Sequence, residues 1–482
     1  MRKHLRILTL LVVLATATVF AQTKKEWGSK FDYDIKTEID PKVVMVDNYN
    51  HYMISVINKD GMLGQNKIII RKFDQKNTLV NTFIQEFPYK DMFTLHNYLG
   101  SFELGKDKVV VFTDSYSNKT KKKEIHKVVF DKNTDTFTTT LVVGFIFESL
   151  SKSGTAYVVG SQNGAYIGVI YSKFSNKKIA EVDECTVLNA TTLDVAWQKT
   201  VAFPLEFYSG DITLTNSGKL VFVKRVVSKS EKHSLLVVDA SSETDKDLGA
   251  NIKISRPLAI SIGTQDYLIA FNFEARLREW AYSNIMLYDL QSGKILNNDK
   301  IVIFPGIKDI QDVKYNYVNV HDNQIDLFTE SKYQTGSMPS TAFPNDPKFN
   351  DPVYTYGSGT VIVMDTEGKL KSNDKLDVIP FGNELVYSFG VFNQKGNYYI
   401  NTAGFTERGV EYASFYQLTP ETYTSNKKSI IDFVYNVSEE AYLHGSFIHQ
   451  FVNYFPDSKR ILFAKYFSDG KIAFVSYFGV TF

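Results

Sequence analysis

Cysteine is almost absent from this chain of 482 residues, which contains only Cys185. No intrachain disulfide can form, so the fold has to be held together by the packing of its core. Tryptophan is also scarce, at three residues, whereas 36 Phe and 29 Tyr favour β-structure, because aromatic rings pack well on pleated sheets. The formal net charge of +1 gives no electrostatic argument for a nucleic-acid partner or an anionic membrane.

The familiar motifs of catalysis and metal binding are also missing. The sequence contains no HExxH, no cysteine pair and no cluster of histidines, so it predicts no zinc site. It also has no GxSxG and no glycine-rich phosphate loop. Calcium is the one cofactor left open, at NKDG from Asn58 and at Asp346 with Asp351, although neither has EF-hand spacing. These absences favour a protein that is not an enzyme, but they do not exclude an active site assembled from distant loops.

A long apolar run occurs only at the N-terminus. Two arginines and a lysine within the first six residues precede an apolar core over residues 7–20. This pattern predicts a signal peptide over residues 1–21, cleaved between Ala21 and Gln22. No later run approaches the roughly 20 apolar residues of a membrane-spanning helix. We therefore expect a mature chain without a transmembrane segment, located in the periplasm or outside the cell.

The rest of the sequence repeats one pattern, in which an apolar strand ends at a short polar residue and a turn follows. IMLYDLQSGKIL, from Ile285, is the clearest example. Asp and Asn side chains can hydrogen-bond to the backbone two residues further on, which starts a turn, so each pivot residue predicts a β-hairpin. The pivot residues are Asp74, Asp131, Asn189, Asp239, Asp289, Asp365 and Gln417.

A second hairpin precedes each of these, so the repeating unit is a four-stranded antiparallel meander. Such a sheet cannot bury both of its faces alone, but sheets stacked around an axis bury one another. The sequence therefore predicts one all-β domain over residues 22–482, an eight-bladed β-propeller, with seven blades as the fallback. The last unit lacks a fourth strand, and we expect the spare strand Lys30–Ile39 near the N-terminus to complete it. The turns of the preceding hairpins lie near Asn50, Asp107, Asn163, Ser217, Gln265, Asp322, Lys395 and Asp457.

The segments YDLQSGKIL and VLNATTLDVAWQ resemble the repeat of the quinoprotein-like propellers, within the wider WD40-like superfamily. In that repeat an Asp-x-x-Ser/Thr-Gly turn joins the two outer strands and a tryptophan often follows, as Trp197 does here. The resemblance implies eight blades closed by a terminal strand. The quinoprotein-like superfamily contains both quinone-dependent dehydrogenases and cofactor-free scaffold proteins. With one cysteine the chain cannot form the vicinal pair found near the cofactor in many of the dehydrogenases, which favours the scaffold branch.

We expect ligand contacts on the rim that carries the connections between second and third strands. The longest connection, residues 332–357, is rich in proline and aromatic residues and is predicted to be an insertion loop that contacts a partner. A flap over the channel and an insertion without a role are the alternatives. The segment 273–282 could form one or two helical turns, and ion pairing between neighbouring loops is the alternative role of its charged residues. The candidate binding residues are Arg276, Arg278, Trp280, Tyr282, Tyr333, Phe343, Tyr354, Tyr356, Arg408 and Glu411.

Three classes of function are compatible with the predicted fold, the third being a quinone- or metal-dependent oxidoreductase, which the missing cysteine pair disfavours. The first is an exported, non-catalytic propeller that binds a protein partner in the cell envelope, as an accessory of an outer-membrane assembly, transport or secretion machine. The second is a secreted carbohydrate-active enzyme or lectin with its site in the mouth of the channel. The enzyme would need two carboxyl groups roughly 5 to 10 Å apart in that mouth. The sequence names neither the partner nor the ligand.

Overall fold

The computed structural model describes residues 24–34, 37–47, 49–58, 66–88, 94–147, 149–226, 232–249, 252–276, 279–301, 310–339, 350–376, 389–394, 396–405, 411–418, 429–432, 445–448 and 451–479. Strands dominate, and the one helix among these residues is a short 3-10 turn, η1 (Leu150–Lys152). No helix in these ranges is long and apolar enough to cross a membrane. The predicted signal peptide and its cleavage site lie outside the described residues and stay predictions.

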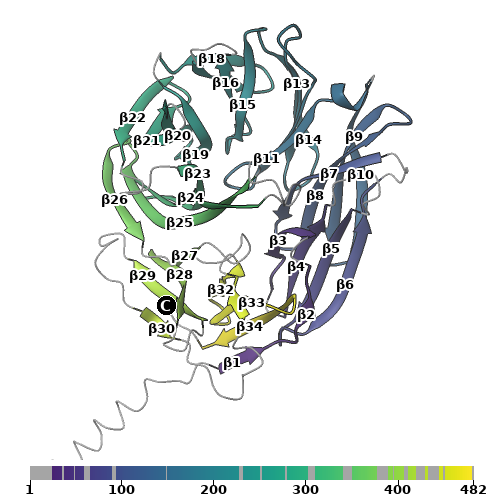
Figure 1. Ribbon diagram of the computed structural model, residues 1–482, viewed down its shortest axis with the longest axis vertical. Coiled ribbons are helices and arrows are strands. Elements are labelled where there is room, and N and C mark those ends of the chain that lie inside the picture. The colour runs from purple at the N-terminus through teal and green to yellow at the C-terminus, as the bar shows by residue number, and fades with distance from the viewer. Residues whose placement is uncertain are drawn as a thin grey trace, which may run out of the picture.

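Eight antiparallel sheets follow one another around a ring, which confirms the predicted eight-bladed β-propeller (Figure 1). In seven of the sheets, four consecutive strands pair in chain order. The strands of blades one to four are β3 (Glu38–Val44), β4 (Asn50–Ile57), β5 (Lys67–Asp74) and β6 (Leu79–Glu86); β7 (Thr94–Leu104), β8 (Lys108–Ser117), β9 (Lys122–Asp131) and β10 (Thr136–Ile146); β11 (Thr155–Gly160), β12 (Tyr166–Ser172), β13 (Val182–Asn189) and β14 (Val195–Ala202); β15 (Phe207–Leu214), β16 (Leu220–Val226), β17 (His233–Val238) and β18 (Glu243–Asp247).

Blades five to seven have the same order, whereas in blade eight the first two short strands both pair with the third. Their strands are β19 (Ile254–Ile262), β20 (Gln265–Arg276), β21 (Glu279–Asp289) and β22 (Lys294–Lys300); β23 (Ile310–His321), β24 (Gln324–Pro339), β25 (Asn350–Asp365) and β26 (Leu370–Leu376); β27 (Gly390–Gln394), β28 (Asn397–Phe405), β29 (Glu411–Leu418) and β30 (Ser429–Asp432); and, in blade eight, β31 (Gly445–Phe447), β32 (Asn453–Phe455), β33 (Arg460–Phe467) and β34 (Lys471–Phe478).

The first strand of each blade lies nearest the axis of the ring. First strands of successive blades contact one another from β7 to β27. Fourth strands such as β6, β10, β14 and β18 are instead largely exposed. The core lies between neighbouring blades, as where Ile170 and Val187 of blade three pack with Phe222 of blade four. Each apolar sheet face is thus covered by the next blade.

The polar pivots behave as the sequence predicts. At Asp74, Asp131, Asn189, Asp239, Asp289 and Asp365, a side-chain oxygen accepts a hydrogen bond from a backbone N–H two to four residues further on. Each of these turns joins the third strand of a blade to the fourth. Gln417 lies within β29, and the connection that follows it is outside the described residues. Trp197 on β14 also docks as expected, since its indole Nε1–H donates to the Gly218 carbonyl of blade four at 2.9 Å.

An N-terminal strand completes the last blade, as predicted, but only Phe31 and Asp32 of the predicted segment take part. β1 (Lys24–Trp27) and β2 (Phe31–Asp32) pair antiparallel with β34, beside which β1 lies in Figure 1. The expected strand Lys30–Ile39 is interrupted after Asp32. Asp34 is the cause, because its carbonyl accepts the backbone N–H groups of Thr37 and Glu38 and turns the chain. Glu38 then begins the first strand of blade one.

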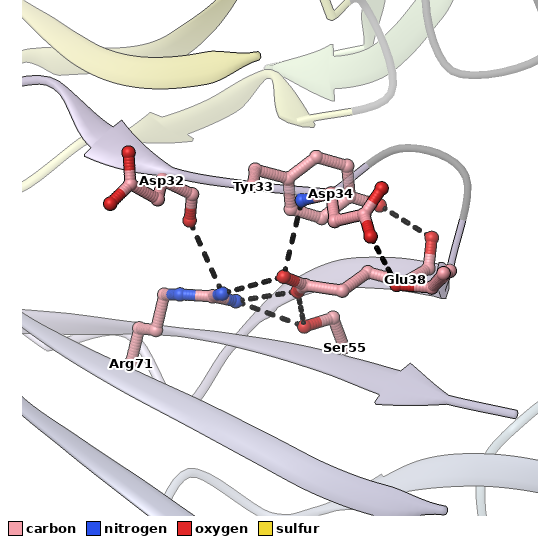
Figure 2. Close-up of polar contacts among 7 residues, drawn as sticks. Asp32, Tyr33, Asp34, Glu38, Ser55 and Arg71 are labelled. Carbon is pink, nitrogen blue, oxygen red and sulfur yellow. Dashed lines mark hydrogen bonds and ion pairs between the residues drawn. The ribbon is translucent and has the colours of Figure 1, made fainter. Parts of the chain in front are cut away.

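A buried ion pair fixes this turn against blade one (Figure 2). Arg71 on β5 donates two hydrogen bonds, each 2.8 Å long, to the two carboxylate oxygens of Glu38. Its guanidinium also donates to the Ser55 hydroxyl at 3.0 Å and to the Asp32 carbonyl at 3.3 Å. The Tyr33 hydroxyl donates to the Glu38 carbonyl. One buried cation therefore holds both the closing segment and the first blade.

A second polar cluster joins blade one to blade eight. Asn77 is fully buried in the turn between β5 and β6, and its side-chain oxygen accepts hydrogen bonds from Arg460 at 2.9 Å and Ser476 at 3.1 Å. Its amide nitrogen donates to the Glu26 carbonyl on β1 at 3.0 Å. Gly28 passes so close that a Cβ there would lie 2.0 Å from the Asn77 carbonyl oxygen. We call these four polar residues (Asn77, Arg460, Ser476 and Glu26) the closure cluster.

Candidate functional site

Because every blade is a meander with the same orientation, the strand ends that lead into the links between blades and into the connections between second and third strands lie at one rim of the ring. We call this the connection rim. The opposite rim carries the turns from first to second and from third to fourth strands, including the polar pivots. The sequence placed its candidate binding residues on the connection rim, and the strand topology agrees for those that the structure describes.

Blade five extends beyond its own sheet at this rim. β20 and β21 continue to pair as far as Arg276 and Glu279, although neither pairs with a flanking strand beyond Asn272 and Asn284. The result is a two-stranded ribbon. It corrects the expectation of helical turns over residues 273–282, because pairing between the strands overrides the helix propensity of Glu, Ala, Leu and Arg there.

Blade six extends further. β24 and β25 are paired with each other out to Pro339 and Asn350, while their flanking strands β23 and β26 stop pairing at Tyr333 and Gly359. The predicted loop over residues 332–357 is therefore mostly a β-ribbon, and only residues 340–349 of it lie outside the described residues. We call the two extensions the rim ribbons.

The structure distributes the ten candidate binding residues as follows. Seven lie on strands that reach the connection rim, at backbone positions set by the register. Arg276, Trp280 and Tyr282 are on the ribbon of blade five, Tyr333, Tyr354 and Tyr356 are on that of blade six, and Glu411 begins β29 of blade seven opposite Phe405. Arg278, Phe343 and Arg408 lie outside the described residues.

A pocket that the sequence did not suggest opens on the same rim, between blades three and four. Its volume is about 270 Å³. The link before blade three, the ends of β11 and β12, and the first strand of blade four all contribute to it. We call it the seam pocket, and it is lined by Leu150, Ser151, Gly154, Thr155, Tyr157, Ser172, Lys173, Phe174, Ser175, Glu181 and Ser209.

One carboxyl group lines this pocket, and a second lies buried behind its wall. Glu181, just before β13, lines it and accepts a 3.1 Å hydrogen bond from the Ser209 backbone N–H and another from the Ser209 hydroxyl. Asp183, two residues on, is fully buried and opposite Ser172 in the pairing of β12 with β13. Neither Asp183 oxygen has a hydrogen-bond donor in good geometry, and the nearby Ser172 hydroxyl makes only a poorly aligned contact with this carboxyl.

The pKa of Asp183 is raised to about 7, mainly by burial and also by the adjacent Glu181 carboxyl, while the Ser172 hydroxyl opposes the rise. The same environment raises the pKa of the Tyr157 hydroxyl, mainly through burial and then through Glu181 and Asp183. Buried carboxyls that change charge near neutral pH are characteristic of functional sites, because a purely structural role would favour replacing them with neutral residues.

The segment AEVDECTV did carry a signal for this site. In a strand, residues at every second position face the same way, so Glu181, Asp183 and Cys185 share one face of the hairpin. Cys185 is buried in the core between blades three and four. Two carboxyls on a face that becomes apolar core are unusual. Sequence reasoning considered only the cysteine of this set and missed both acids, together with Tyr157 and Ser172.

Among the described residues, no group of three or more His, Cys, Asp or Glu could hold a metal ion. The two calcium candidates lie largely elsewhere. After Asn58, the rest of NKDG is outside the described residues, as is Asp346, and only the backbone of Asp351 is placed, on β25. Calcium at those positions stays a prediction.

A His–Asp–Tyr cluster occurs on the opposite rim. His321 Nε2 lies 2.5 Å from the Asp326 carboxylate, to which the Tyr398 hydroxyl also donates. Asn319 donates to the Tyr398 oxygen at 2.8 Å. Since Asp326 is fully buried and Tyr398 comes from the next blade, this cluster ties blade six to blade seven. Its members satisfy one another, so we assign it a structural role.

No protein-family model matches the chain, and no curated protein sequence is similar to it. Similar solved structures include the β-propeller domain of the Trilobed protease from Pyrococcus furiosus (9% identity, 83% of this chain and 98% of that one, TM-score 0.36). Another is an acylaminoacyl peptidase from Pyrococcus horikoshii (12% identity, 92% of this chain and 59% of that one, TM-score 0.38). A third is a eukaryotic initiation factor (10% identity, 90% of this chain and 83% of that one, TM-score 0.41). The chain spans 59% of the peptidase. At these TM-scores the similarities carry no argument about the function of this chain.

Proposed function

We propose that this chain is an exported, non-catalytic β-propeller of the cell envelope, and that it binds a protein partner on the connection rim. The observation that carries the proposal is the pair of rim ribbons on the adjacent blades five and six. The basic residues and apolar core of residues 1–21 support export. The scaffold branch of the quinoprotein-like propellers fits this role, because it uses the propeller as a binding surface without a cofactor.

The physical argument concerns the edges of the ribbons. A two-stranded ribbon is at best marginally stable in water, and its outer edges present backbone N–H and C=O groups without strand partners. In the ribbon of blade six, residues 334–339 and 350–354 pair only with each other within the described chain. An extended segment of another protein can add to such an edge as a further strand, and tyrosine and tryptophan often anchor interfaces of this kind.

The alternative function, cleavage of carbohydrate, requires two carboxyl groups that flank a glycosidic bond with room for the bond between them. The one pair found at a described pocket, Glu181 and Asp183, does not have this arrangement. The two carboxyls lie close enough for a hydrogen bond between them to help raise the pKa of Asp183. They also lie at a seam between blades rather than across the mouth of the channel.

The experiment is a comparative capture from envelope extract of the source organism, with the tagged mature protein as bait. The test variant replaces three ribbon residues together, Tyr333→Ser, Tyr354→Ser and Tyr356→Ser. The matched control, Val80→Ser with Ile84→Ser, removes exposed apolar residues from the outer strand β6, where they are 58% and 56% exposed. Circular dichroism and thermal unfolding check that all three proteins are folded.

We expect at least one protein to be enriched equally by wild type and control and to be lost from the ribbon variant. Cross-links from that protein should fall on blades five and six. Capture of nothing by the folded wild type, or capture that the ribbon variant retains in full, would show that the rim ribbons are not a binding surface.

A further inference from the structure

The walls of the seam pocket are fixed without any ligand. Lys123 on β9 donates to the Gly154 carbonyl at 3.1 Å, and the buried Tyr171 hydroxyl donates to the Ser153 carbonyl, so the link before blade three is held at both residues. Gly154 has φ +68°, and a Cβ there would lie 2.2 Å from the Ser172 carbonyl oxygen. The link therefore requires glycine at this position, and the cavity beside it is preformed.

The charge inside the pocket is not balanced by the protein. Lys173 lines the pocket, but its ammonium is 2.6 Å from Glu184 and is neutralised there. Glu184 also accepts a hydrogen bond from Thr200. Over the described ranges of the chain, neither Glu181 nor Asp183 has a basic side chain within ion-pair distance. Burying unpaired carboxylates is costly, so the pocket is set up to receive positive charge.

The hydrogen-bonding groups of the pocket that the protein does not fully satisfy also favour a positively charged ligand. The Ser172 hydroxyl lines the cavity and is 8% exposed, and its contact with the Asp183 carboxylate behind it is too poor in geometry to satisfy either group. A buried carboxylate can only accept hydrogen bonds, and a serine hydroxyl can accept as well. The unused capacity here therefore calls for a ligand with several N–H donors on one atom. The Tyr157 ring, 44% exposed at the cavity wall, adds an aromatic face of the kind that attracts cations.

We propose that the seam pocket binds a primary alkylammonium group, with Glu181 and Asp183 as its counter-charges, Ser172 as a further acceptor and Tyr157 as the aromatic wall. The source is a small free amine or a lysine side chain. This site lies on blades three and four, so it is independent of the partner surface proposed for blades five and six.

A metal ion fits the same groups less well. Calcium takes six to eight oxygen ligands, including several carboxylates. The described residues supply only two carboxyls here and no third metal-binding side chain. A cavity of about 270 Å³ is also larger than one ion needs and close to the lower end of ligand pockets, which begin at roughly 300 Å³.

Binding should depend on pH in a definite direction. An alkylammonium stays charged up to about pH 10, whereas Asp183 carries a proton below neutral pH because burial raises its pKa to about 7. The cation has to displace that proton, so affinity should fall as pH falls. The ionisable groups facing Asp183 are Glu181, Glu184, Cys185 and Tyr157, and β14 places uncharged Val201 opposite it.

The test is isothermal titration of the full mature protein with n-butylammonium and with Nα-acetyl-lysine methyl ester. Neutral n-butanol and calcium chloride serve as comparison ligands. The variants are Glu181→Gln, Asp183→Asn and Tyr157→Leu. The control, Asp194→Asn, removes an exposed carboxylate from the turn of the same hairpin. Urea unfolding verifies that each variant is folded.

We expect saturable amine binding at pH 8 that is at least tenfold weaker at pH 5. Both carboxyl variants should lose at least tenfold in affinity at pH 8, Tyr157→Leu should lose a few-fold, and the control should match wild type. Binding of both amines indicates a lysine side chain as the source, and binding of n-butylammonium alone indicates a free amine. The proposal is overturned if no amine binds, if folded Asp183→Asn binds as well as wild type, or if butanol or calcium binds as tightly.

Discussion

Replacing Asp183 with asparagine should stabilise the protein at pH 8, and by less than half as much at pH 5. In the fold this carboxyl is fully buried against Glu181 without a donor. Asparagine has nearly the same shape as a protonated aspartic acid and can donate to Glu181 as that acid does. The substitution therefore removes the cost of ionisation while it keeps the packing.

The magnitude follows from linkage. The pKa of Asp183 is raised from 3.8 to about 7, so between these pH values the folded state binds more protons than the unfolded state. Folding stability from this group therefore falls as pH rises through that window, and the full cost is present above pH 7. At about 1.36 kcal/mol per pH unit, the cost is roughly 4 kcal/mol.

The assay is urea unfolding followed by tryptophan fluorescence, with wild type, Asp183→Asn and the exposed-site control Asp194→Asn at both pH values. The midpoint of the Asp183→Asn transition should rise at pH 8 by the equivalent of about 2 to 4 kcal/mol, with an unchanged slope. At pH 5 the gain should be smaller by at least half. An equal gain at both pH values, or a loss at pH 8, would refute the assignment of Asp183 as a buried carboxyl that ionises near neutrality.

Three further predictions concern the closure of the ring and a buried histidine. Asn77→Ala should cost about 1.5 to 3 kcal/mol in urea unfolding, because it removes one of the two hydrogen-bond acceptors that the described residues give the buried Arg460 guanidinium and leaves only Ser476; a cost below 1 kcal/mol would contradict the closure cluster. Arg71→Met should be similarly destabilising because it leaves Glu38 buried and unpaired, and adding Glu38→Gln should recover at least half of the loss; a double variant no better than the single one would count against this. Burial holds the pKa of His51 well below its usual value, so the unfolded state takes up a proton below about pH 6.5 and stability falls as pH drops; His51→Phe should reduce this acid sensitivity in unfolding scans from pH 7 to 5, and an unchanged pH slope would contradict it.

The architecture could be predicted because its signals are local. A pivot such as Asp289 makes its turn with atoms only two or three residues away, so spacing along the chain was enough to place the hairpins. The sequence predicted that an N-terminal strand closes the ring, but it missed β1 and extended the strand beyond Asp32. Whether β1 or the segment after Asp32 pairs with β34 depends on the turn at Asp34 and on contacts with Arg71, which lies far along the chain.

The seam pocket could not be predicted in the same way. Ser172 and Asp183 are opposite each other because of strand register, and Ser209 reaches Glu181 from another blade. The rim ribbons were misread for a related reason. Proline and polar residues between 332 and 357 suggest a loop by composition, yet register places Pro339 opposite Asn350 at the end of a ribbon, where a proline costs few hydrogen bonds.

The join between β1 and β34 also has a consequence for how copies of the protein could exchange parts. β34 is apolar through most of its length, and without β1 it would present a bare edge of the kind on which neighbouring molecules template one another. If β1 of a second copy took that place, every pairing in both rings would be preserved, which is the condition for domain swapping. Because β1 is tethered to the same chain, its local concentration at β34 is high, and it covers an edge that would otherwise favour aggregation.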